Sequence, residues 1–258
     1  MRKINLSIVA LCFLIVTLGC SKNKKNPDEF FGFKEYQTVT GNRLAVSDNI
    51  QKAYELLIVG ELLIVSNPMD TMTYLAYKSL GLPKNRIIGM GGTLDSSRFK
   101  TYLSLALDKP ANDIQGMVIG GHGDTTMIPL TRLASYNGVP VSQFLSEEAL
   151  AKVAADTMVG GATLTGLLGT SAWYAPGASV AYLVDAILND QKKMIPCSVF
   201  LEGEYGQSDI CIGVPCIIGK NGVEQIVDIQ LNEAEKALFA KSADAVRNMN
   251  NDLKSHLA

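Results

Sequence analysis

The sequence MVIGGHGDTTMIPL, residues 117–130, carries a histidine out of an apolar run and into a glycine-rich turn. Glycine has no Cβ, so backbone and small molecules can approach such a turn closely. His122 is one of two histidines in the chain, and the other, His256, lies among the last three residues. Imidazole gives and takes a proton near neutral pH. His122 is therefore the natural candidate for a general acid and base.

A second stretch, GGTLDSSRF at residues 91–99, supplies the groups that such a histidine needs. A carboxylate bonded to one ring nitrogen fixes the tautomer and stabilises the charged form, and either Asp95 or Asp124 can do this. Asp95 and Arg98 stand three apart in a predicted helix start, so they share one face. A guanidinium can bind a substrate carboxylate through two hydrogen bonds. The two stretches together predict an acid/base pair beside an anion clamp.

Each of these residues also has an ordinary structural interpretation. A histidine in a glycine-rich turn is often a hydrogen-bonding residue of the fold, and a single arginine is often a solvated charge. An aspartate directly after His-Gly often belongs to the turn itself. Spacing alone leaves these alternatives open.

Composition limits the class of protein. A chain of 258 residues, 47% of them hydrophobic, can build one sizeable core or two small domains. A formal charge of −2 gives no reason to expect a nucleic-acid partner. The cysteines form no C-x-x-C pair or Cys/His metal pattern, so no metal is expected. Three of them lie in strand-like apolar runs and are expected to be buried free thiols, with a disulfide left open if the chain is exported: Cys197, Cys211 and Cys216.

Residues 1–20 have the features of an export signal. Arg2 and Lys3 precede an apolar run that is short for a transmembrane helix. A cysteine directly after the expected cleavage point resembles a bacterial lipoprotein signal, although the residues before it depart from that motif. We expect export with lipidation of Cys20 and membrane anchoring through it. An uncleaved anchor and an artefact of the gene model are the alternatives.

Residues 21–60 are predicted to be a linker and an unassigned segment. Up to about residue 43 the chain is polar and broken by proline and glycine, which favours a tether. Residues 55–66, ELLIVGELLIVS, nearly repeat one six-residue unit. The second copy fits a buried parallel strand at residues 62–65. The first copy has no assigned counterpart.

The remaining pattern predicts alternating helices and strands. A helix is expected over residues 69–80, closed by Gly81, and a strand over 86–90. Ser146 predicts the cap of a helix reaching about residue 168, within which Gly160-Gly161 indicates close packing or a kink. The later elements are a helix at 178–188, strands at 194–201, 211–218 and 224–229, and a hairpin turn at 220–222.

The last predicted element is a helix that begins with a capping box. Asn232 is its cap, and Glu235 stands three residues later. One apolar stripe is predicted to face the core: Leu238, Val246, Met249, Leu253 and Leu257.

Several motifs, in order, resemble those of the NAD-dependent malate and lactate dehydrogenases, and most closely the lactate-dehydrogenase-like malate dehydrogenases. The first three are VSNPMD at 65–70, GTLDSSRF at 92–99 and GGHGDT at 120–125. Later blocks are TSAWYAPG at 170–177, GEYG at 203–206 and GVP at 213–215. The resemblance therefore runs from about residue 62 almost to the C-terminus.

This resemblance implies an α/β fold. Residues 61–90 would be the last two strands of an NAD-binding Rossmann sheet, and residues 91–258 an α+β C-terminal substrate domain. The implied reaction is the interconversion of malate and oxaloacetate, a 2-hydroxy and a 2-oxo dicarboxylate, by hydride transfer between C2 and NAD. Enzymes of this kind are commonly homo-oligomers.

Residue roles are implied in the same way. His122 would accept the hydroxyl proton when malate is oxidised, and Asp95 would hold its imidazole. Arg98 would bind the substrate carboxylate, and Asn67 would lie between substrate and nicotinamide. Ser171 falls near the substrate pocket.

The glycine-rich turn that binds pyrophosphate has no match in the sequence. A dinucleotide fold needs G-x-G-x-x-G between a strand and a helix. The two G-x-G triplets, at 89–91 and 121–123, have Leu94 and Thr126 in place of the third glycine. The first four strands of the sheet are thus unaccounted for. We expect weak or no activity from the isolated chain, and an open apolar edge at 62–65 unless residues 44–60 or another subunit cover it.

Two other functions stay open at the level of sequence. One is a non-catalytic, lipid-anchored envelope protein that uses the domain to bind small carboxylates or a protein. The other is an export leader joined to a dehydrogenase fragment without function. The leader predicts the cell envelope, whereas the resemblance predicts the cytoplasm.

Overall fold

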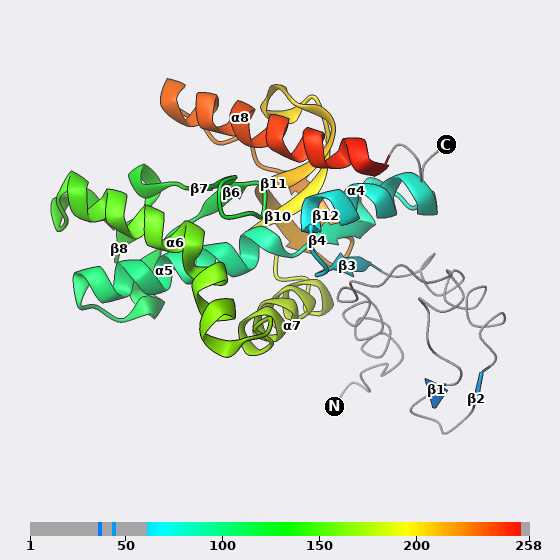
Figure 1. Cartoon of the computed structure of the whole chain (residues 1–258), viewed down its shortest axis with the longest axis horizontal. Coiled ribbons are helices and arrows are strands. Elements are labelled where there is room, and N and C mark those ends of the chain that lie inside the picture. The colour runs from blue at the N-terminus through cyan, green and yellow to red at the C-terminus, as the bar shows by residue number, and fades with distance from the viewer. Residues whose placement is uncertain (1–35, 38–42, 45–60, 254–258) are drawn as a thin grey trace.

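A seven-stranded mixed sheet forms the centre of the molecule. The computed structural model describes residues 36–37, 43–44 and 61–253 (Figure 1). The strands follow the order β3-β4-β10-β11-β6-β7, and β12 pairs with β11. Their bounds are β3 Leu62–Ile64, β4 Ile87–Gly89, β6 Val118–Gly120, β7 Met127–Pro129, β10 Lys193–Glu202, β11 Ser208–Gly219 and β12 Gly222–Ile226.

Five α-helices surround this sheet in the described part of the chain. The helices α4 and α8 pack against each other and against β11, whereas α5 packs with α6 and α7 (Figure 1). Their bounds are α4 Met69–Leu80, α5 Gly91–Leu107, α6 Glu147–Leu168, α7 Tyr174–Leu188 and α8 Glu233–Asn250.

Short elements complete the described chain. A three-stranded sheet contains β5 Ile114–Gln115, β8 Ser135–Tyr136 and β9 Val139–Pro140, and β1 Tyr36–Gln37 pairs with β2 Arg43–Leu44. Single turns of 3-10 helix are η1 Lys84–Arg86, η2 Ala111–Asp113, η3 Thr131–Leu133, η4 Val141–Gln143, η5 Glu204–Gly206 and η6 Asn251–Leu253.

The unit formed by β3, α4 and β4 agrees with the prediction. The two strands are parallel, with Leu62 opposite Ile87, and all three residues of β3 are buried. Burial on both faces explains the unbroken apolar run of a parallel strand. The helix ends at Gly81, whose φ of +62° is the left-handed conformation that glycine adopts at low cost. Among the described strands, β3 has a neighbour on one side only and forms an edge.

The three predicted antiparallel strands are also present. Gly219 pairs with Gly222 across the two-residue turn Lys220–Asn221, and β12 ends at Ile226, before the predicted residue 229. These strands belong to the same sheet as β3 and β4, because β10 pairs with β4 through Ser198 and Gly89. The two predicted domains therefore share one sheet, and the boundary at residue 90 stays a prediction.

Helix α6 follows its prediction and α7 does not. The side chain of Ser146 accepts a hydrogen bond from the N–H of Ala149, which caps α6 as expected. The prediction that the next helix begins at residue 178 is wrong, because α7 begins at Tyr174. Pro176 lies in its first turn, where the N–H that proline lacks would have no helical partner in any case.

The capping box of α8 is confirmed, but its apolar stripe is wrong in part. The side chain of Asn232 accepts from the N–H of Glu235, and the Glu235 carboxylate accepts from the N–H of Asn232. Leu238 is 51% exposed and Met249 is 37% exposed. Val246 is buried as predicted, and the rest of the buried face contains Phe239, Ser242 and Ala243. Small and polar side chains face inward here because the glycine-rich turn after β6 packs closely against them.

Two hydrophobic cores hold these elements together. The larger one lies around the central sheet, and the smaller one joins α5, α6 and the three-stranded sheet through Phe99, Leu103 and Val153. Cys197, Cys211 and Cys216 are buried free thiols, as predicted. Among residues 36–37, 43–44 and 61–253 no helix is long and apolar enough to span a membrane. The leader with Cys20, most of the linker, the first repeat copy and Leu257 lie outside the described residues.

Candidate acid/base site

Three strand ends converge on His122. The carboxyl end of β3 leads through Asn67 into α4, the carboxyl end of β4 leads into α5, and β6 ends two residues before His122. Ligands of open α/β sheets bind beyond the carboxyl ends of the parallel strands. The topology therefore places His122 where a small substrate is expected to bind.

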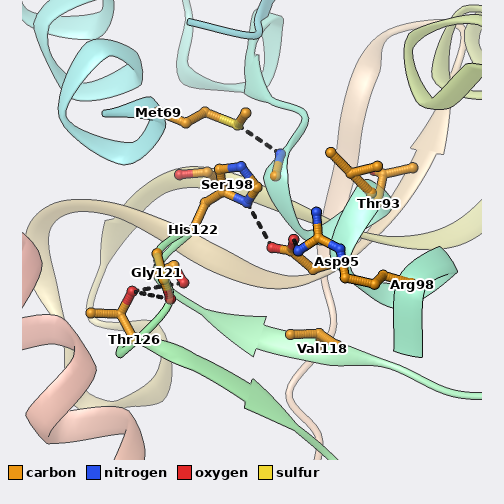
Figure 2. A network of polar contacts seen from close by, with 12 residues as sticks. Met69, Thr93, Asp95, Arg98, Val118, Gly121, His122, Thr126 and Ser198 are labelled. Atoms are coloured by element: carbon orange, nitrogen blue, oxygen red, sulfur yellow. Dashed lines mark hydrogen bonds and ion pairs between the residues drawn. The ribbon is translucent and has the colours of Figure 1, made fainter. Parts of the chain in front are cut away.

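Asp95 holds the imidazole of His122. Its Oδ2 lies 2.7 Å from Nδ1, and Asp95 is 2% exposed, whereas the histidine side chain is 12% exposed (Figure 2). A proton on Nδ1 donates to the carboxylate, which leaves Nε2 for exchange with a ligand. Within the described residues, Nε2 forms no hydrogen bond. This is the geometry of a general base oriented by a carboxylate.

Gly91 makes room for the ring. A Cβ on this residue would lie 2.8 Å from Cβ and 2.9 Å from Cγ of His122. The N–H of Gly91 donates to Sδ of Met69 at 2.7 Å, which ties the start of α5 to the start of α4 (Figure 2). The absence of a side chain at residue 91 thus fixes how closely the imidazole packs on the helix.

The turn that carries His122 is held from two sides. Oγ of Ser242, on α8, accepts from the N–H of Gly121 at 2.9 Å and donates to the carbonyl of Thr126 at 2.8 Å. Oγ1 of Thr126 donates to the carbonyl of Gly121 at 3.0 Å (Figure 2). These bonds satisfy backbone groups of Gly121 and Thr126, the two buried ends of the turn.

A second buried carboxylate, Asp70 of α4, also binds this turn. Its Oδ2 accepts from the backbone N–H of His122 at 2.6 Å, and its Oδ1 accepts from Oγ of Ser198 at 2.6 Å. Asp70 is 2% exposed. Asp70 is the last residue of the VSNPMD motif, but no pattern in the sequence indicated a role for it or for Ser198 on β10.

Charges around the imidazole favour its protonated form. Burial acts to lower the pKa of His122, but the charge and hydrogen bond of Asp95, together with the charge of Asp70, outweigh it and raise that pKa. Arg98 opposes the rise. A histidine with a raised pKa carries its proton over more of the neutral range, in the state that can donate to a carbonyl oxygen.

Arg98 lies beside Asp95 and against α6. Its Nη1 donates to Oδ1 of Asp95 at 3.3 Å, and its side chain is 18% exposed. A Cβ on Gly160 would lie 2.7 Å from Cδ of Arg98, and one on Gly161 would lie 3.3 Å from Nη2. The glycine pair therefore serves close packing, one of the two predicted alternatives, and the partner in that packing is the arginine stem.

The other predicted residues are less closely involved. Asn67 is exposed just after β3, and Ser171 is exposed in the connection between α6 and α7. No described hydrogen bond joins either residue to His122, Asp95 or Arg98, so their roles stay predictions. Asp124 is exposed in the turn, and the carboxylate on Nδ1 is that of Asp95. The geometry thus decides between the two candidate carboxylates.

Fold and site together define an α/β domain with an acid/base histidine and an arginine at the carboxyl ends of parallel strands. The family described as lactate/malate dehydrogenase, alpha/beta C-terminal domain, matches residues 92–256. The chain belongs to the lactate/malate dehydrogenase family, as its motifs indicated.

Curated relatives of high sequence identity are named malate dehydrogenase. The chain is 82% identical over 212 residues to "Malate dehydrogenase" of Flavobacterium johnsoniae, which covers 82% of this chain and 67% of the relative. It is 69% identical over 210 residues to "Malate dehydrogenase" of Bacteroides thetaiotaomicron, covering 81% of this chain and 66% of the relative. The chain thus spans about two thirds of the length of these relatives.

Solved structures show the same fold. Malate dehydrogenase from Aeropyrum pernix matches with a TM-score of 0.77 at 38% identity, over 82% of this chain and 68% of that one. The lactate dehydrogenase from Cryptosporidium parvum, complexed with lactic acid and nicotinamide adenine dinucleotide, matches with a TM-score of 0.76 at 35% identity, over 80% and 67%. By family this chain is therefore an oxidoreductase with NAD as cofactor.

The described residues can be compared with the two ends of that cofactor. Asn67 is exposed at the carboxyl end of β3, and its place beside a nicotinamide stays a prediction. Within residues 61–253 no glycine-rich turn joins a strand to a helix in the G-x-G-x-x-G pattern that pyrophosphate requires. These residues therefore do not fit the pyrophosphate end of the cofactor.

Proposed function

We propose that residues 61–253 form the substrate half of a malate dehydrogenase. The observation that carries this proposal is the hydrogen bond between His122 and Asp95, with Arg98 on the same face of α5. The substrate would be a 2-hydroxy dicarboxylate, malate, and the product its 2-oxo counterpart, oxaloacetate. The names of the curated relatives support this substrate class.

Each residue has one task in the proposed reaction. Nε2 of His122 accepts the hydroxyl proton of malate and returns it to the carbonyl oxygen in the reverse direction. Asp95 keeps the proton on Nδ1 and stabilises the imidazolium that forms. Arg98 binds the carboxylate next to the reacting carbon through charge-assisted hydrogen bonds. When bound, NAD supplies the acceptor for the hydride of C2.

Turnover would depend on groups beyond the described site. Residues outside 61–253 or a partner subunit would have to bind the pyrophosphate, and without them we expect weak or no activity. Acid/base catalysis contributes only about 10²–10⁴-fold and cannot replace a hydride acceptor.

The test is reduction of oxaloacetate by NADH with the purified full chain, together with calorimetric binding of NADH. His122→Asn is expected to reduce turnover by roughly 10²–10⁴-fold. His256→Asn, which changes the other histidine, is the matched control and should leave turnover unchanged. If the parent chain turns over oxaloacetate measurably, equal turnover in the His122→Asn variant would exclude the proposal. Binding of oxaloacetate without NADH binding would support the substrate half and locate the defect in the cofactor half.

A second candidate function is favoured by the leader sequence. An exported chain with an acylated Cys20 would be an envelope protein that uses this domain to bind small carboxylates or another protein. Fractionation of cells and the mass of the mature N-terminus test it. A mature chain that begins at acylated Cys20, with carboxylate binding but no NADH binding, would favour this function over the enzyme.

A further inference from the structure

The buried carboxylate of Asp70 links three elements of the site through its hydrogen bonds. It belongs to the first turn of α4, it binds the backbone of His122 after β6, and it accepts from Ser198 on β10. Both oxygens lie 2.6 Å from their donors. Short bonds from two different elements leave the carboxylate little freedom to move.

We propose that Asp70 is a positioning residue for His122, one that holds the backbone of the histidine turn and balances the charge of the protonated imidazole. This inference deepens the proposed function and rests on it for the acid/base role of His122. The contact itself is independent of any catalysis.

The two carboxylates near His122 act on different atoms. Asp95 accepts a hydrogen bond from Nδ1 of the ring, whereas Asp70 accepts one from the backbone N–H of the same residue. Asp95 therefore orients the ring about its side-chain torsions, and Asp70 fixes the point on the backbone from which the ring projects. Loss of the Asp95 contact would let the ring rotate about its side-chain torsions, whereas loss of the Asp70 contact would let the backbone of His122 shift.

Charge counting supports the same role. The charged groups that act on the imidazole are Asp95 and Arg98 from α5 and Asp70 from α4. With both carboxylates ionised and Arg98 charged, this cluster is neutral when His122 carries its proton. A buried cluster with balanced charge avoids the desolvation cost of an unpaired ion.

The titrations of Asp70 and His122 are coupled. Burial raises the pKa of Asp70 and the charge of Asp95 adds to that rise, whereas the hydrogen bonds from Ser198 and His122 and the charge of His122 act against it. The charge of Asp70 in turn acts to raise the pKa of His122. The proton on the imidazole and the negative charge on Asp70 therefore favour each other.

Removal of the Asp70 charge should leave the turn folded. Ser242 and Thr126 hold it from the side of α8 through bonds that do not involve Asp70. Asn has nearly the shape of Asp: its Oδ1 can accept from the His122 N–H, and its amide group can donate to the Ser198 hydroxyl, which also accepts. Asp70→Asn thus removes the charge without emptying the space.

The test follows His122 directly by NMR. In the full chain with His256→Ala, His122 is the only histidine, and its ring nitrogens can be titrated without overlap. Asp70→Asn is expected to lower the pKa of His122, because the negative charge that favours the protonated ring is lost. It should also speed hydrogen exchange of the His122 amide by roughly tenfold, because that N–H loses a charged acceptor.

Asp209→Asn is the matched control. Asp209 also binds α4, through Tyr74 and Lys78, but its side chain is 64% exposed and it does not contact His122. Its φ of +55° is one that asparagine tolerates. This variant should leave both the pKa and the amide exchange of His122 as in the parent.

The outcomes separate this inference from the proposed function, because neither readout needs turnover. A folded Asp70→Asn variant with the pKa and amide exchange of the parent would overturn the positioning role, whatever the activity. If that variant does not fold, Ser198→Ala replaces it, since it removes one of the two bonds that fix Asp70. It should speed exchange of the His122 amide, and unchanged exchange would equally overturn the role.

Discussion

Gly91 is the first residue of α5 and lies directly against the imidazole of His122. A single added methyl group at this residue would change the position of the ring. The Cβ of an alanine would lie 2.8 Å from Cβ of His122. Contacts this short force one of the two groups to move. The histidine is the more mobile partner, because the backbone of Gly91 is part of a helix that packs on the sheet.

We therefore expect Gly91→Ala to displace the ring from Asp95. The pKa of His122 should fall, because the ring loses the partner that stabilises its charged form while it stays partly buried. Titration of His122 by NMR measures this change. Gly177→Ala is the control, since a Cβ there meets no atom within 4 Å and the residue lies in α7. An unshifted pKa in a folded Gly91→Ala variant would contradict the steric argument.

His122 should also make stability depend on pH. Its pKa is raised in the folded chain above the ordinary value of 6.5, so the folded state binds this proton more tightly than the unfolded chain does. The stabilisation is complete below about pH 6.5 and is lost as pH rises through the folded-state pKa. A tenfold difference in proton affinity between the two states corresponds to about 1.4 kcal/mol.

Urea unfolding at a series of pH values measures this dependence. In the parent the unfolding free energy should decline above pH 6.5, and His122→Asn should flatten the decline, while His256→Asn should keep it. The same decline in the His122→Asn variant would assign the effect to another group.

At the scale of elements, α5 and α6 position the arginine together. Arg98 projects from α5, but its stem occupies the space that two glycines leave open on α6. The hydrogen bond to Asp95 and this packing fix the guanidinium from two sides. The anion clamp is thus a property of a helix pair, although its charged residue stands on one helix only.

Two alanine substitutions on α6 test this packing: Gly160→Ala disturbs the stem of Arg98, and Gly166→Ala does not. A Cβ at residue 160 would lie 2.7 Å from Cδ of Arg98, whereas one at residue 166 meets nothing within 4 Å. Gly160→Ala is expected to destabilise the fold by about 1–3 kcal/mol through overpacking and to weaken oxaloacetate binding. Gly166→Ala should stabilise it by about 0.5–1 kcal/mol, since alanine favours helix.

Urea unfolding measures the stability of the two variants, and calorimetry measures their affinity for oxaloacetate. Equal binding by the two variants would show that α6 does not position Arg98.

At the scale of the whole molecule, one sheet carries both the parallel unit and the antiparallel strands. The described sheet has β3 at one edge, and edge strands with apolar residues tend to pair with further chains. Large apolar side chains are also exposed at the connection between α6 and α7. Leu167 is 80% exposed, Trp173 is 72% exposed and Tyr174 is 92% exposed. Exposed apolar side chains that gather in one patch mark association surfaces, and we expect these three residues to contribute to one.

We therefore expect the full chain to be a homo-oligomer in solution. Light scattering coupled to gel filtration measures its mass. Replacing Trp173 and Tyr174 by serine should shift the mass towards the monomer, because apolar area that a second copy covers is lost. Leu105→Ser, at a single leucine that is 72% exposed on α5, is the control and should not change the mass. A monomeric parent chain would contradict this prediction.

Local patterns were enough to predict most elements and the centre of the site. The strand at 62–65, the helix at 69–80 and the capping box of α8 depend on neighbouring residues in the chain, so periodicity and turn residues indicate them. The ordered motifs indicated the family, and with it the pairing of His122 with Asp95 that the structure shows. Each of these features follows from residues a few positions apart or from a motif that is read as a unit.

Tertiary structure alone decided the rest. It brought Asp70 and Ser198 to the histidine turn, placed the stem of Arg98 against Gly160, and chose Phe239 over Leu238 for the buried face of α8. Asp70 and Ser198 are 128 positions apart in the chain, and no local preference couples residues at that separation. Which face of a helix is buried depends on what packs beside it. Such contacts exist only once the sheet has formed and fixed the distances between its elements.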